Sequence, residues 1–72
     1  MTPLYFKIRS IRERQRLTQE YMAAELGISL KSYNEWETGK VKIRTDRLEE
    51  IAKILKTTPE DIYTYQLDVP VF

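Results

Sequence analysis

A small all-α domain of five helices is the fold class that the sequence predicts, and two observations predict it. Apolar residues recur at helical spacing, as at Leu4, Ile8 and Ile11. Gly27 and Gly39, the two glycines of the chain, each follow a stretch of this kind, where a helix commonly ends in a left-handed residue. At 72 residues the chain can bury one small core, so a single domain is expected.

The first and fifth helices have clear start signals. The first is expected from Pro3 or Leu4 to Arg14, because proline is tolerated in the first turn of a helix. The fifth is expected after Thr58-Pro59, where an N-cap residue precedes a proline at the first helical position. Ile62 and Tyr63 of this last helix are expected to close the core.

The fourth helix follows a loop over residues 41–44. Thr45 or Asp46 is its expected N-cap, and Glu49 lies three residues after Asp46, as in a capping box. The helix is expected to end near Lys56. Its buried face is predicted to consist of four apolar residues: Leu48, Ile51, Ala52 and Leu55.

Residues 17–40 carry the most information about function, because they predict two short helices joined by a tight turn. The first begins at Thr18-Gln19, buries Met22, Ala23 and Leu26, and ends at Gly27. The second begins at Ser29 and ends at Gly39. It is expected to bury Tyr33 and Trp36 and to present a polar face of Lys31, Asn34 and Glu35. A short helix with outward hydrogen-bonding side chains, supported by another helix, suits the major groove of DNA.

Charge is distributed unevenly along the chain, although the net charge is only +1. Residues 1–44 hold nine Lys and Arg against five Glu, whereas residues 45–72 hold three against six acids. A basic half that contains the two-helix motif is expected if one face of the domain meets phosphates. Ordinary solvated faces explain the asymmetry equally well.

Several classes of protein are excluded or disfavoured by composition. The chain has no Cys and no His, which excludes disulfides, zinc fingers and catalysis by either residue. No Gly-rich phosphate loop, metal-ligand cluster or nucleophile–base pair is present, so no enzyme, cofactor or metal site is expected. No apolar run approaches the roughly 20 residues that span a bilayer, and no signal peptide follows Met1. A cytoplasmic protein without a membrane partner is therefore expected.

The chain resembles the Cro/C1-type helix-turn-helix family of phage repressors and bacterial regulators over about residues 4–64. The resemblance rests on a combination of motifs: Thr18-Gln19, Met22-Ala23, Leu26-Gly27-Ile28-Ser29, Trp36-Glu37-Thr38-Gly39-Lys40 and Leu48-x-x-Ile51-Ala52-x-x-Leu55. It implies a lambda-repressor-like fold and sequence-specific binding of double-stranded DNA in transcription regulation. Because a domain this small makes a modest interface, tight binding would need a second copy, as a homodimer on DNA. The apolar pattern up to residue 64 is used by the core and leaves dimerisation open.

The resemblance also implies the roles of individual residues. Those expected at base edges are Leu30, Lys31, Ser32, Asn34 and Glu35. Those expected at phosphates are Thr18, Gln19, Gly39, Lys40, Lys42 and Arg44. Arg12 and Glu37 match a partly buried ion pair between the first and third helices, for which we expect a structural role.

Elementary chemistry supports some of these assignments and leaves alternatives to others. Lys31 can donate to guanine O6 and N7, and Glu35 can accept from cytosine N4, although an i, i+4 pair with Lys31 competes for Glu35. Leu30 suits a thymine methyl, but a lone exposed leucine needs no explanation. Gln19 at a helix N-terminus suits a phosphate. Tyr33 and Trp36 are expected in the core rather than as base-stacking surfaces.

The C-terminal tail, residues 65–72, has a different pattern. From Tyr63 to Val71 an apolar residue stands at every second position, as in a strand, but Pro70 interrupts the pattern. The tail is expected to be a linker or terminal segment, with an edge strand that pairs with a second copy as the alternative. Such an apolar tail, together with the low net charge, suits a second function for the same fold, a protein-interaction module such as an antitoxin or adaptor.

Overall fold

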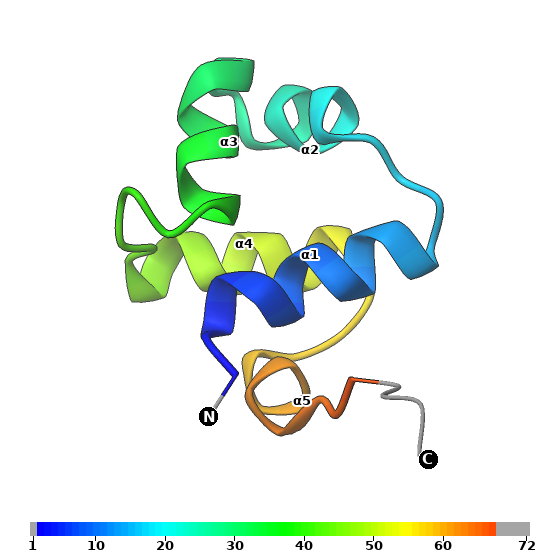
Figure 1. Cartoon of the computed structure of the whole chain (residues 1–72). Coiled ribbons are helices and arrows are strands. Elements are labelled where there is room, and N and C mark those ends of the chain that lie inside the picture. The colour runs from blue at the N-terminus through cyan, green and yellow to red at the C-terminus, as the bar shows by residue number, and fades with distance from the viewer. Residues whose placement is uncertain (1, 68–72) are drawn as a thin grey trace, which may run out of the picture.

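The computed structural model describes residues 2–67 and contains five helices in that range. They are α1 (Leu4–Arg14), α2 (Gln19–Leu26), α3 (Leu30–Glu37), α4 (Thr45–Ile54) and α5 (Pro59–Thr64). Figure 1 shows α2 and α3 above the pair formed by α1 and α4, with α5 beneath that pair. The predicted all-α class and the number of helices are confirmed.

Local capping accounts for the ends of α2, α3 and α5. The hydroxyls of Thr18, Ser29 and Thr58 each accept a hydrogen bond from a backbone N–H three residues later, as the N-cap preference predicts. Gly27 and Gly39 have φ angles of +68° and +77°, so both adopt the predicted left-handed conformation after their helices.

The start of α4 differs from the prediction. Arg44, rather than Thr45 or Asp46, is the N-cap, because its backbone is extended and its carbonyl accepts from the Leu48 N–H. An arginine side chain has no acceptor, so no side-chain cap forms and the Asp46–Glu49 capping box is absent. The helix ends at Ile54, two residues before the predicted end, because Lys56 adopts a φ of +57°.

The core is a single apolar cluster to which every helix contributes. Its fully buried members include Ile8, Met22, Tyr33, Ile51 and Ile62. Tyr63 does not belong to it and is 57% exposed. Adjacent residues of a helix point in directions about 100° apart, so Tyr63 faces solvent when its neighbour Ile62 faces the core. The prediction that Tyr63 closes the core was wrong, and Tyr65, just after α5, packs against the core instead.

The period-two pattern of the tail is also broken at its start, because Tyr63 lies within a helix. Residues 65–67 have no regular secondary structure. Val69, Pro70 and Val71, on which the strand alternative depends, lie outside the described residues. The domain boundary at residue 64 therefore stays a prediction.

Replacing Gly39 with alanine is expected to destabilise the domain more than replacing Gly27. Both substitutions force a non-glycine residue into the left-handed region, at about 1–2 kcal/mol. At Gly39 the new Cβ would also lie 2.6 Å from the Tyr5 ring, whereas at Gly27 nothing lies within 4 Å. Urea unfolding of the two variants compares the costs, and equal losses would contradict a close contact between Tyr5 and Gly39.

Candidate nucleic-acid interface

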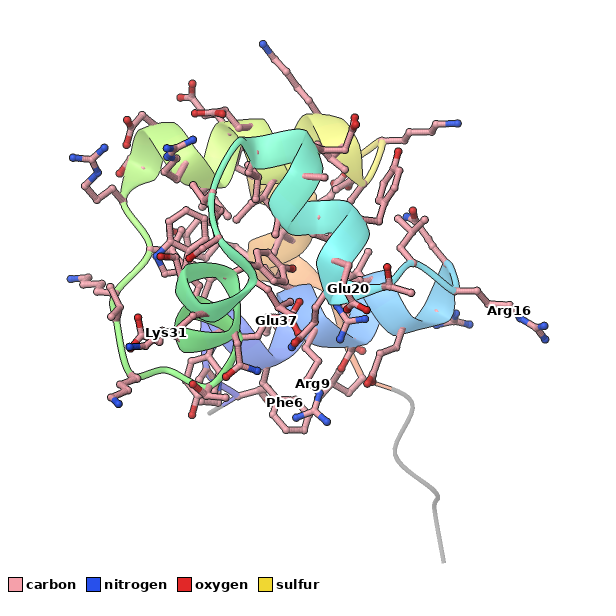
Figure 2. The ribbon with its side chains drawn as sticks, turned by 90° about the horizontal axis from the view of Figure 1, so that it is seen from above. Phe6, Arg9, Arg16, Glu20, Lys31 and Glu37 are labelled. Atoms are coloured by element: carbon pink, nitrogen blue, oxygen red, sulfur yellow. The ribbon has the colours of Figure 1, made fainter. Side chains whose placement is uncertain are left out.

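Helix α3 presents a polar outer surface and a buried inner one. Leu30, Lys31 and Asn34 are exposed, and Ser32 and Glu35 are half-buried. Figure 2 shows Lys31 at the outer edge of α3 and Glu37 between α3 and α1. The five residues predicted to contact base edges therefore lie on one short helix, and Ser29 holds its first turn by accepting from the Ser32 N–H.

A buried carboxylate fixes the inner side of α3. Glu37, 2% exposed, accepts from Arg12 Nε at 2.7 Å and from Arg12 Nη2 at 2.9 Å, and the Tyr33 hydroxyl donates to it as well. The remaining Arg12 nitrogen, Nη1, donates to the Leu17 carbonyl at 2.7 Å. The pair ties α3 to α1 and to the segment before α2, which confirms the structural contact predicted for Arg12 and Glu37.

Burying two charges costs solvation free energy, and in the Arg12–Glu37 pair hydrogen bonds to both side chains offset that cost. The hydrogen bonds to Glu37 raise the pKa of Arg12, so its guanidinium stays charged. Burial, followed by the hydrogen bond to Glu37, raises the pKa of Tyr33 far above its usual value, so its hydroxyl stays a donor. Among the described residues no buried side-chain nitrogen or oxygen lacks a partner.

Gln19, the first residue of α2, lies between this buried pair and the outer face of α3. Its Nε2 donates to Glu37 Oε1 at 3.1 Å, and its Oε1 accepts from Asn34 Nδ2 at 3.2 Å. The adjacent Thr18 hydroxyl caps α2 by accepting from the Tyr21 N–H at 3.0 Å. Gln19 therefore links α2 to α3, and the N-terminus of α2 lies beside the face that carries Asn34.

The loop after α3 carries exposed basic residues. Gly39, Lys40, Lys42 and Arg44 are all exposed. Lys40 lies 3.9 Å from Glu35, and Arg44 lies 3.3 Å from Asp46. The Arg44–Asp46 pair is exposed on both sides, and in the other pair Lys40 is exposed while Glu35 is half-buried. Pairs with exposed partners contribute little free energy, so a phosphate can draw these basic side chains away at low cost.

Comparison with known proteins identifies the fold. A family model described as helix-turn-helix matches residues 8–62, most of the chain. The chain belongs to the Cro/C1-type helix-turn-helix family. Among solved structures, the DNA-binding domain of the P22 C2 repressor, determined by nuclear magnetic resonance, superposes with a TM-score of 0.79 at 19% sequence identity. The match covers 86% of this chain and 82% of that one, and it confirms the lambda-repressor-like fold. No curated protein matches the chain significantly.

Within this helix-turn-helix domain, two sequence predictions about side chains need correction. Glu35 pairs with Lys40 rather than with Lys31, because the loop returns past the end of α3. Trp36 is half-buried rather than buried: it packs edge-on against Tyr33, with ring centroids 6.3 Å apart, and Arg47 lies over it at 5.8 Å. Tyr33 is fully buried, as predicted.

The sequence did not identify the partners in three side-chain hydrogen bonds within the helix-turn-helix. The Tyr33 hydroxyl on Glu37 follows from an i, i+4 spacing, which places two side chains on one helix face, so the pattern could have indicated it. The resemblance implies that Gln19 supports the recognition helix, but its partners Glu37 and Asn34 lie on another helix, and no local pattern indicates them.

Two observations concern other kinds of site. Over residues 2–67 no helix combines the length and the apolar character that crossing a membrane requires. In the same range no three acidic side chains come together in a way that could hold a metal ion.

Proposed function

We propose that this domain is a sequence-specific, double-stranded DNA-binding transcription regulator whose helix α3 enters the major groove. The single observation that carries the proposal is the construction of α3. Its outer face carries the exposed Lys31 and Asn34, and its inner face is fixed to α1 by the buried Arg12–Glu37 pair. A rigidly held helix with exposed hydrogen-bonding groups is what direct contact with base edges requires.

The outer face of α3 supplies the base contacts in this proposal. Lys31 donates to a guanine, and Leu30 packs on a thymine methyl. Glu35 accepts from a cytosine amino group once it leaves Lys40. Ser32 and Asn34 lie beside them on the same helix.

The surroundings of α3 supply the phosphate contacts. The N-terminus of α2, with Thr18 and Gln19, offers backbone and side-chain donors to an anion. The loop after α3 offers Gly39, Lys40, Lys42 and Arg44. A domain of this size makes a modest interface, so tight binding calls for a homodimer on two half-sites about one helical turn apart.

Selection from a random double-stranded DNA library at near-physiological salt tests the proposal. The expected result is enrichment of a two-fold-symmetric motif, which would support specific binding and dimeric recognition together. Weak, salt-sensitive retention without any enriched motif would rule out a sequence-specific regulator that acts as this domain alone.

Substitution of Lys31 by alanine is expected to weaken binding to the enriched motif by about 1–3 kcal/mol and to relax the preference for one guanine. The matched control is Lys53→Ala, which removes an exposed lysine on α4. Titration of both variants with the motif and with a single-base variant at the guanine gives the comparison. Equal affinity losses for the two substitutions would remove Lys31 from the base contacts.

A second candidate function, a protein-interaction module, has a specific observation in its favour. A groove of about 410 Å³ with a mixed polar and apolar lining lies between the start of α1, the loop after α3 and α5, and exposed Val41 and Tyr63 help to line it. Tyr63→Ala is the probe of this surface, because Tyr63 is exposed whereas the nearby Tyr65 packs against the core. An interaction module would lose association through Tyr63→Ala and be indifferent to Lys31→Ala.

A further inference from the structure

The Gln19 side chain has one allowed orientation in this structure, and chemistry fixes it. A carboxylate has no donor, so the Gln19 group that faces Glu37 at 3.1 Å must be the amide nitrogen. The Gln19 oxygen then faces Asn34 Nδ2, which donates to it at 3.2 Å. An amide rotated by 180° would place an oxygen against Glu37 and a nitrogen against a nitrogen.

Glu37 has no further capacity to change this arrangement. Its two oxygens already accept from two Arg12 nitrogens, from Gln19 and from the Tyr33 hydroxyl. Four donors fill the roughly four lone-pair sites of a carboxylate. The hydrogen bonds run from Glu37 through Gln19 to Asn34. Glu37 fixes the buried end of this series, and Asn34 fixes the exposed end.

The consequence for DNA binding lies in the donors of Gln19. A primary amide nitrogen carries two N–H groups, and one of them is used on Glu37. The second is the group that can donate to a phosphate oxygen. Because Asn34 holds the amide oxygen, the direction of this second N–H is set before DNA arrives.

We propose that Asn34 is a positioning residue, which holds the Gln19 amide for a phosphate contact and does not contact a base edge itself. The inference rests on the proposed DNA-binding function and changes the role that the sequence alone indicates for Asn34. It assigns the specificity of α3 to Lys31, Leu30, Ser32 and Glu35. The phosphate contact at α2 and the orientation of α3 then depend on one another through a single side chain.

A double-mutant cycle on DNA binding tests the proposal. Gln19→Ala is expected to lower the affinity for DNA about tenfold, and Asn34→Ala about three- to tenfold, equally for all base sequences. In the Gln19→Ala background, Asn34→Ala should lower it less than twofold, because there is no amide left to hold. The probes are the duplex enriched by selection and a random-sequence duplex of equal length.

A second substitution, Asn34→Asp, replaces the amide donor at position 34 with an acceptor. In Asn34→Asp the new carboxylate has no donor for the Gln19 oxygen that faces position 34, so the contact that holds the amide is lost and the two groups repel each other. The added negative charge weakens DNA binding on its own, and the same substitution in the Gln19→Ala background measures that effect alone. We expect Asn34→Asp to cost more in the presence of Gln19 than in its absence.

A measurement without DNA keeps the proposal testable if no operator is found. Asn34→Ala should shift the side-chain amide resonances of Gln19 in a nitrogen–proton correlation spectrum, whereas Lys31→Ala on the same helix should leave them in place. Unchanged Gln19 resonances would overturn the proposal. The proposal would also be overturned if Gln19→Ala and Asn34→Ala lowered the affinity for DNA independently of one another and Asn34→Ala lost a preference for one base. Failure of all duplexes to bind would instead count against the proposed function.

Discussion

Replacing Glu37 with glutamine is expected to lower the free energy of unfolding by about 3–5 kcal/mol, the usual cost of removing one partner of a buried ion pair. Glutamine keeps the shape of the side chain but not its charge, so the guanidinium of Arg12, a residue only 7% exposed, loses its counter-ion. Tyr33 and Gln19 lose the carboxylate that accepts from them. For a domain whose total stability is on the order of 5–10 kcal/mol, the loss is a large fraction.

Urea unfolding followed by circular dichroism measures this loss. Glu13→Gln is the matched control, because it makes the same chemical change at a side chain 54% exposed, where the expected effect is within about 0.5 kcal/mol. A loss below about 1 kcal/mol for Glu37→Gln would mean that the pair does not hold α3 against α1.

Replacing Lys40, Lys42 and Arg44 with glutamine is expected to weaken DNA binding about a hundredfold at 0.15 M salt. Each phosphate contact contributes about 0.9 to the slope of log affinity against log salt, so three lost contacts should reduce that slope by about 2.7. The effect should be equal for the selected motif and for random DNA, because phosphate contacts carry no sequence information. Stability should hardly change, since the three side chains are exposed.

Titrations of DNA at several salt concentrations test this prediction. The control variant combines Lys53→Glu with Lys56→Gln, which removes the same net charge from exposed positions on and just after α4. An equal change of slope in the control would show that the overall charge of the domain, rather than the loop, controls binding. An unchanged slope in the loop variant would remove these three residues from the phosphate contacts.

The two variants separate stability from binding. Glu37→Gln acts on the support of α3, and the loop substitutions act on a surface that the fold leaves exposed. Partial unfolding lowers the apparent affinity only by the unfolded fraction, so the folded population of each variant should be measured at the temperature of the titration.

The sequence by itself determined the parts of this protein that depend on neighbouring residues. Thr18, Ser29 and Thr58 cap their helices, and Gly27 and Gly39 end theirs, because capping and left-handed turns involve groups within about four residues. The combination of sequence motifs also indicated the family. The resemblance to that family, rather than local reasoning, placed five candidate base contacts on one helix.

The tertiary structure alone decided which residues of different helices are buried and which of them contact one another. Arg44, not Thr45 or Asp46, is the N-cap of α4, and Tyr63 faces outward, because the packing of whole helices sets the backbone conformation and decides which side chains are buried. Glu35 turns to Lys40, and Asn34 meets Gln19 across 15 positions of sequence. Such contacts depend on how three helices are oriented in space, and the orientation follows from the shared core and the Glu37 carboxylate, which no local pattern contains.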